Sequence, residues 1–178
     1  LLRGTSFTAA ALRSALAEPA GWDAVLYLGH SDSGPNGGVL HLGDGSQLDG
    51  QALETTWADA ARRGLRLLLF NSCSGLQLAH HAARAGIAWA VCFVEPVPAA
   101  AAAAAFAQLL DTLETGSDLL TAIDHTRKHL ADSEGYEGCD LLLAAVASAA
   151  AEPFHLPLRR RRQFVLRLAH SSRRQAIA

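Results

Sequence analysis

Apolar residues along the chain fall into two kinds of segment, which predict buried strands and amphipathic helices. The strand-like segments are short, almost wholly apolar and bounded by turn-forming residues, and they cover residues 23–28, 65–70, 87–94 and 141–146. The helix-like segments have apolar residues at a spacing of three or four, and they cover residues 6–18, 49–63, 76–85, 98–114 and 117–130. A small hairpin is expected at residues 39–45.

The order of these segments predicts an α/β fold. Strands that alternate with helices form crossover connections, so we expect a three-layer sandwich with a mostly parallel central sheet and helices on both faces. In such sheets, chemistry gathers in the loops that follow the carboxyl ends of the strands. The loops after the first two predicted strands contain His30 and Cys73.

The composition fits one domain large enough to bury a full core. The chain has 178 residues, is 50% hydrophobic and has a net charge of −2. It begins with Leu1 and Leu2 and contains no Met, so we expect it to be a piece of a longer protein. Its N-terminus lacks a signal-peptide pattern, and no segment is apolar and long enough to predict a membrane span.

The three cysteines do not form a recognisable framework. Cys73, Cys92 and Cys139 lie far apart and no C-x-x-C pair occurs, so neither a disulfide scaffold nor a zinc ribbon is predicted. A reducing cytoplasm is therefore the expected location. Cys92 and Cys139 lie inside apolar runs and are predicted to be small core residues.

Charge is divided unevenly along the chain. Residues 1–158 carry eight Lys and Arg against all 17 Asp and Glu, a net charge of 8 − 17 = −9, whereas residues 159–178 carry seven Arg. This basic tail has two open interpretations, a solvated linker or a docking strip for a surface or an acidic partner. The docking residues would be Arg159, Arg160, Arg161 and Arg162. Without interleaved aromatic residues, the run does not predict specific nucleic-acid binding.

The stretch VLYLGHSDSG, which begins at Val25, is compatible with two kinds of catalytic site. It nearly matches the G-x-S-x-G nucleophile elbow with Ser31 as the attacking group, and it equally fits a strand that delivers His30 as a base. An elbow needs a helix directly after the nucleophile. Pro35 and four glycines within residues 29–38 exclude that helix, so the second interpretation is favoured.

The stretch LLLFNSCSGLQLAHHAA has the strand, tight turn and helix that the first stretch lacks. Its turn holds Cys73, and the positive end of the following helix favours the thiolate form of a nearby thiol. Adjacent strands lie about 5 Å apart, so His30 at the end of a neighbouring strand would reach this thiol. The alternative is an inert thiol and a hydrogen-bonded loop histidine.

These two stretches, together with the segment from Ala85 to Leu130, resemble the CHAT peptidases of the caspase-like superfamily. The likeness covers roughly residues 1–158, which would be the peptidase domain, with residues 159–178 as a basic tail or linker. It implies a caspase-like fold and hydrolysis of peptide bonds in a protein substrate, with Cys73 as nucleophile and His30 as acid and base. The backbone N–H groups of Cys73 and Ser31 would stabilise the oxyanion, although the family usually has glycine in place of Ser31.

The resemblance also indicates where a substrate would bind and which partners to expect. The candidate substrate-binding residues are Asn71, two positions before the cysteine, and the acidic strand-end residues Asp32 and Glu95. The acidic body favours a basic side chain before the cleaved bond. A sensor or regulatory domain is expected in the flanking segments, and the whole would be a bacterial signalling or defence protein.

No metal or cofactor is expected. His125 and His129 have the spacing of a zinc pair on a helix, but no Glu follows His125 and no third ligand is evident. The alternative to an enzyme is a catalytically silent signalling or scaffold module that keeps the fold and uses the basic tail to recruit a partner.

Overall fold

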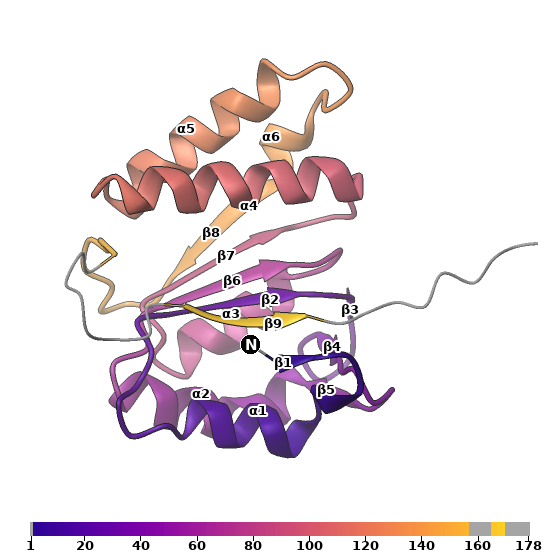
Figure 1. Ribbon diagram of the computed structural model, residues 1–178, viewed down its shortest axis with the longest axis vertical. Helices are drawn as coiled ribbons and strands as arrows, with labels where there is room; N and C mark the ends of the chain where they lie inside the picture. The colour runs from indigo at the N-terminus through magenta and orange to yellow at the C-terminus, as the bar shows by residue number, and fades with distance from the viewer. Residues whose placement is uncertain (1, 157–164, 170–178) are drawn as a thin grey trace, which may run out of the picture.

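The central sheet is mixed and mostly parallel. The computed structural model describes residues 2–156 and 165–169, and in this part of the chain six strands lie in the order β1-β9-β2-β6-β7-β8 (Figure 1). Their bounds are Leu2–Arg3 (β1), Val165–Ala169 (β9), Ala24–Leu28 (β2), Leu67–Asn71 (β6), Trp89–Phe93 (β7) and Leu143–Ala147 (β8). Only β8 pairs antiparallel among these strands, so the predicted α/β fold with a mostly parallel sheet is confirmed.

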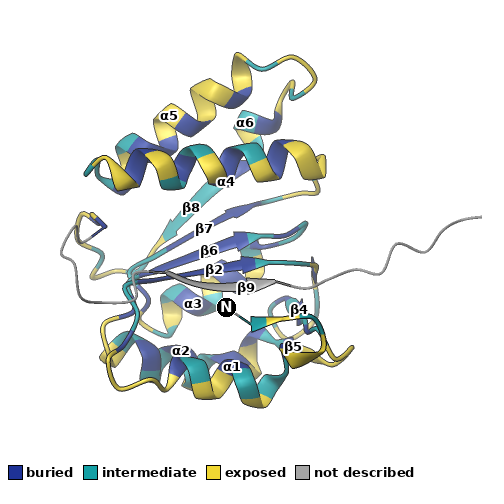
Figure 2. Cartoon of the chain, in the orientation of Figure 1, coloured by how far each residue is buried: buried dark blue, intermediate teal, exposed yellow. Residues whose placement is uncertain are grey.

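Helices cover both faces of this sheet, because its strands are apolar on both sides. On β2, Val25 and Tyr27 pack on one side and Ala24 and Leu26 on the other, as the two-residue repeat of a strand requires. The first side is covered by α1 (Ala9–Leu16), α2 (Gly50–Arg62) and α3 (Leu76–Arg84). The second is covered by α4 (Ala99–Glu114) and α5 (Leu119–Ala131), which gives the predicted three layers (Figure 2).

Side-chain caps fix the starts of three helices. The Thr8 hydroxyl accepts a hydrogen bond from the Ala11 N–H, and Asp49 does the same for the Ala52 N–H. The first helix therefore begins at Ala9 rather than at Ser6, and the residues before it form a short 3-10 turn, η1 (Gly4–Ser6). Asp118 caps α5 in the same way.

The last predicted strand runs against the others, and the reason is the number of helices before it. After β7 the chain returns along α4 and comes forward again along α5, so it is back at the carboxyl edge of the sheet when α6 (Cys139–Leu142) leads into β8. From that edge the strand has to run backwards. One long helix instead of two would have produced a parallel strand.

A second, smaller sheet lies directly after the first candidate residue. It consists of β3 (Ser31–Asp32), β4 (Val39–His41) and β5 (Gln47–Asp49), all antiparallel. The predicted hairpin is present as β4 and β5. The sequence did not predict β3, which lies in the stretch expected to be loop.

Strand β9 is the main element that the sequence did not predict. It lies within the expected basic tail and pairs with both β1 and β2. Arg159, Arg160, Arg161 and Arg162 lie outside the described residues. Within residues 2–156 and 165–169, no helix has the length and apolar character needed to cross a membrane.

Candidate active site

The pairing register of two central strands places His30 and Cys73 at the same level. Leu28, the last residue of β2, is paired with Asn71, the last residue of β6. His30 lies two positions after Leu28, and Cys73 lies two positions after Asn71. The strands remain joined beyond this pair, because the Gly29 N–H donates to the Asn71 carbonyl at 3.2 Å. Parallel neighbours are about 5 Å apart, so the two loops begin side by side.

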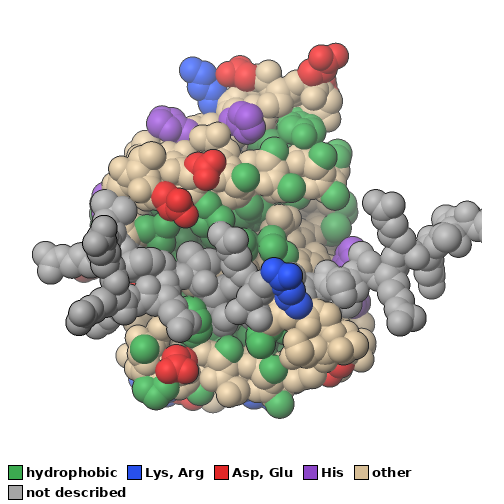
Figure 3. All heavy atoms as spheres, viewed as in Figure 1, with side chains coloured by type: hydrophobic (Ala, Val, Ile, Leu, Met, Phe, Trp, Pro, Cys, Tyr) green, Lys and Arg blue, Asp and Glu red, His purple; other side chains and the backbone are tan. Residues whose placement is uncertain are grey.

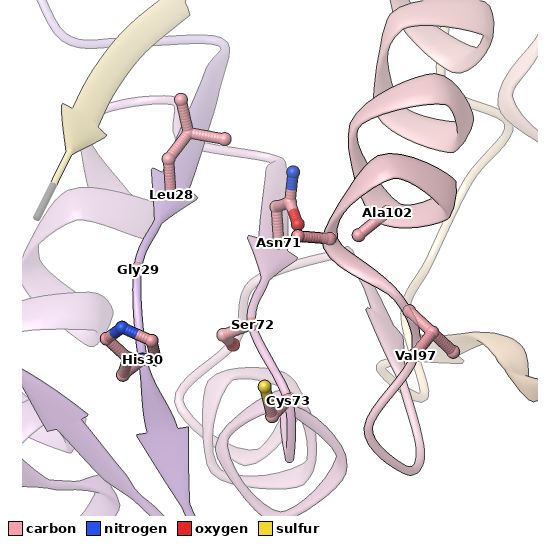
Figure 4. A pocket seen from close by; sticks show the side chains of 9 residues that line it. Leu28, Gly29, His30, Asn71, Ser72, Cys73, Val97 and Ala102 are labelled. Carbon is pink, nitrogen blue, oxygen red and sulfur yellow. The ribbon is translucent and has the colours of Figure 1, made fainter. Parts of the chain in front are cut away.

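Both candidate catalytic residues line one pocket at this edge. The pocket has a volume of about 290 Å³, with His30 on the β2 side and Cys73 on the β6 side (Figure 4). His30 is exposed and Cys73 is half-buried, so a molecule in the pocket has access to both the imidazole and the sulfur. The remaining lining residues are Leu28, Gly29, Asn71, Ser72, Val97, Ala99 and Ala102.

A buried serine ties the two loops together. The Ser31 side chain is only 1% exposed, and its hydroxyl donates to the Ser72 Oγ at 2.7 Å. The same oxygen accepts a hydrogen bond from the Ser74 N–H at 3.2 Å. Ser31, which directly follows His30, is therefore hydrogen-bonded to the residues on both sides of Cys73, Ser72 and Ser74. Its side chain is a structural tie, which agrees with the sequence argument against Ser31 as a nucleophile.

The buried Tyr27 hydroxyl is hydrogen-bonded to the backbone of His30. The Tyr27 hydroxyl lies 2.6 Å from the His30 carbonyl oxygen and 2.9 Å from the His41 carbonyl oxygen, and it is the donor to these carbonyls. Burial raises the pKa of Tyr27 far above its ordinary value of 10.0, so the hydroxyl keeps its proton across the physiological range. The His30 carbonyl also accepts from the His41 N–H at 3.0 Å, which fixes the backbone at this point.

The backbone N–H groups predicted to form an oxyanion site are not used by the surrounding ladder and turn. The bond from the His41 N–H to the His30 carbonyl makes Ser31 and Leu40 a non-hydrogen-bonded pair, so the Ser31 N–H points away from β4. In the turn before α3, the Ser74 N–H is bound by Ser31 and the Gly75 N–H by Phe93. Within the described residues the Cys73 N–H makes no hydrogen bond.

Gly75 lets the turn that carries Cys73 lie close against the sheet. A Cβ at this position would lie 2.5 Å from the Cys92 Cβ and 3.2 Å from the Phe70 Cβ. Both atoms are Cβ carbons, which are bonded directly to the strand backbone and cannot move aside unless the strand moves. Glycine is therefore required between Cys73 and α3, because the turn lies too close to β6 and β7 for a side chain.

The three candidate substrate-binding residues do not lie together. Asn71 lines the pocket, on β6 opposite Ala102 of α4 (Figure 4). Asp32 follows the inward-pointing Ser31, so its side chain is 71% exposed, and it pairs with His41 at 2.7 Å. Glu95 is exposed in the segment between β7 and α4 and does not line the pocket.

The pocket adjoins a groove beneath α4 that is lined by apolar residues and by two carboxylates, Asp111 and Glu114. The groove has a volume of about 360 Å³ and shares Leu28 and Asn71 with the pocket. Leu26, Phe106 and Leu110 form its walls. Figure 3 shows hydrophobic side chains below α4, with acidic side chains beside them. The shared residues connect the pocket at the thiol to this groove, whose lining includes Asp111 and Glu114.

The other cysteines and histidines lie apart from this pocket. Cys92 and Cys139 are 0% and 5% exposed, which confirms them as core residues. Burial raises the pKa of the Cys92 thiol to about 12. His125 and His129 are exposed on α5, and residues 2–156 contain no group of three or more His, Cys, Asp or Glu arranged to hold a metal ion.

Sequence reasoning missed the residues that hold the candidate pair in place. Tyr27, Ser72 and Ser74 carry the hydrogen bonds that support His30 and the Cys73 turn. A signal was present, since Tyr27 lies in an otherwise aliphatic strand and both loops are rich in serine. A buried tyrosine usually has a hydrogen-bond partner for its hydroxyl.

Comparisons with known proteins do not identify a relative of this chain. No protein-family model matches it, and a search of curated proteins finds no significant match. The resemblance to the CHAT peptidases therefore stays a prediction that depends on the two strand-end stretches.

Proposed function

We propose that this chain is a cysteine endopeptidase that hydrolyses peptide bonds in a protein substrate through His30 and Cys73. The observation that carries the proposal is the shared pocket, which is lined by both an exposed His30 and a half-buried Cys73 at the ends of two paired strands. This is the combination of nucleophile and base that acyl transfer requires. As in the CHAT peptidases that it resembles, the chain would be the effector part of a bacterial signalling or defence protein.

The proposed reaction has two steps. The Cys73 thiolate attacks the carbonyl carbon of the scissile bond, and the protonated His30 gives its proton to the leaving amine, so that a thioester forms as the C–N bond breaks. His30 then takes a proton from water, and the resulting hydroxide attacks the thioester. The C–S bond breaks, the peptide acid leaves, and the Cys73 thiolate and protonated His30 are restored.

The backbone supplies the stabilisation of charge in this scheme. The carbonyl oxygen becomes negatively charged in each step, and the N–H groups of Cys73 and Ser31 would donate to it. Two observations support this role. The Cys73 N–H has no other partner among the described residues, and the Ser31 N–H is outside the β3–β4 ladder.

Digestion of a peptide library by purified protein, followed by mass spectrometry of the new termini, tests the proposal. We expect His30→Ala and Cys73→Ala each to abolish cleavage while circular dichroism shows an intact fold. His125→Ala, which removes an exposed histidine far from the pocket, is the matched control and should cleave as the parent does. If the parent protein cleaves nothing and a thiol-directed peptide ketone does not label Cys73, the silent scaffold is the better account.

A further inference from the structure

The space beside the Cys73 sulfur contains no acidic side chain. The pocket is lined by aliphatic residues, by His30, by Ser72 and by the neutral amide of Asn71. All 17 Asp and Glu of the chain lie within residues 2–156, so the residues outside the described ranges have no acidic side chain to add. No Asp or Glu of the whole chain therefore lines this pocket.

Asp32 and Glu95, the acidic residues that follow His30 and precede Val97 by two positions, do not point into the pocket. Asp32 projects to the face of β3 opposite Ser31 and is held by His41. Glu95 is exposed, and of its segment only Val97 reaches the pocket. Asp111 and Glu114 line the adjoining groove beneath α4 but not this pocket. None of these four carboxylates lines the space next to the thiol.

In a peptidase the residue on the amino side of the cleaved bond, P1, has its side chain within a few ångströms of the attacking sulfur. The pocket of Leu28, Asn71, Val97 and Ala102 is the space that adjoins Cys73, so it is where this side chain would go. A Lys or Arg there would lose its hydration without gaining an ion pair, which is unfavourable. An aliphatic side chain would gain by burial against the apolar walls.

We propose that the pocket selects a neutral aliphatic P1 residue, with Asn71 as the specificity-determining residue. This inference depends on the proposed peptidase function, and it replaces the expectation of a basic P1 residue that rested on overall charge. The acidic surface acts at long range, but the pocket itself is neutral. A single carboxylate in place of the Asn71 amide would change its preference.

Fluorogenic peptides that differ only at P1, with Leu, Ala or Arg, test the proposal in the full chain. We expect the parent protein to cleave the Leu peptide at least tenfold faster than the Arg peptide, measured as kcat/KM. Asn71→Asp should shift the ratio toward Arg by about 10- to 100-fold, the usual effect of a hydrogen bond to a charged group. Gln51→Glu adds the same charge on α2 outside this pocket and should leave the ratio unchanged.

A second variant, which enlarges a side chain that lines the pocket and leaves its charge unchanged, tests whether this pocket holds the P1 side chain. Ala102 is nearly buried on the α4 wall, and Ala102→Leu should fill the space and lower cleavage of the Leu peptide relative to the Ala peptide. Cys73-dependent cleavage with a preference for Arg, or a ratio that neither variant changes, would overturn this inference and leave the peptidase function standing. Failure of all three peptides, together with no labelling of Cys73 by peptide ketones, would overturn the peptidase function itself.

Discussion

At the scale of single residues, the three cysteines differ sharply in accessibility. Cys73 is half-buried at the pocket, whereas Cys92 and Cys139 are enclosed in the core. The thiolate is the form that attacks an alkylating reagent, and the raised pKa of Cys92 keeps that thiol protonated. The contrast makes Cys73 the one thiol of the three that a reagent reaches in the folded protein.

We therefore predict that iodoacetamide modifies one thiol in the native protein and three after unfolding in denaturant. Intact-protein mass spectrometry measures the number of adducts directly. The control is Cys73→Ala, which should take up no reagent when native and two equivalents when unfolded. Rapid native labelling of Cys92 or Cys139 would contradict the described packing.

Which residues of the site were predictable depends on how local their signal is. His30 and Cys73 could be predicted to lie together because each follows a short apolar run that ends at the same edge of the sheet, whereas Asn71 was a candidate only through the resemblance. The outward direction of the Asp32 side chain could not be predicted. It depends on the neighbouring Ser31 pointing inward to Ser72, which lies 41 residues away in the sequence. Side-chain direction in a two-residue strand is set by the partner loop.

At the scale of elements, Asp49 connects a helix start to the loop that follows β3. Its carboxylate accepts hydrogen bonds from the Ala52 N–H at 2.7 Å and from the Asn36 amide at 3.0 Å. These bonds, the backbone one first, lower the pKa of Asp49 from its ordinary value of 3.8. The folded state therefore holds the proton of Asp49 less tightly than the unfolded state does.

The stabilisation from Asp49 should be complete above about pH 4–5 and decrease as pH falls through the lowered pKa. We predict that Asp49→Asn is less stable than the parent near neutral pH, by less than about 1 kcal/mol because the group is largely solvated. The difference should shrink toward pH 3. Urea unfolding at several pH values measures it, with Asp124→Asn on the exposed face of α5 as control. A difference that grows on acidification would refute the assignment.

The elements themselves were predictable where their signals are local. Periodicity and capping residues indicated all the long helices and the buried strands, with ends shifted by a few residues. Strand β9 was missed because its five residues contain Arg167 and follow an arginine run, so nothing local marks them as part of a sheet. Its place between β1 and β2 is set by long-range pairing alone.

At the scale of the whole molecule, one edge of one sheet organises the candidate chemistry. The parallel strands β2 and β6 end side by side, and the segment after β7 and the start of α4 close the pocket from the other side. Net charge says little about this site, because none of the carboxylates that make the body acidic lines the pocket itself. The account depends on His30 and Cys73 acting as one unit.

The most direct measurement of that claim is kcat/KM for one cleaved peptide with the parent protein, His30→Ala, Cys73→Ala and the double variant. Residues that act as a unit give strongly non-additive losses. We predict that either single substitution removes nearly all activity and that the double variant is no worse than the singles. Losses that multiply, or a His30→Ala protein as active as the parent, would contradict the proposed pair.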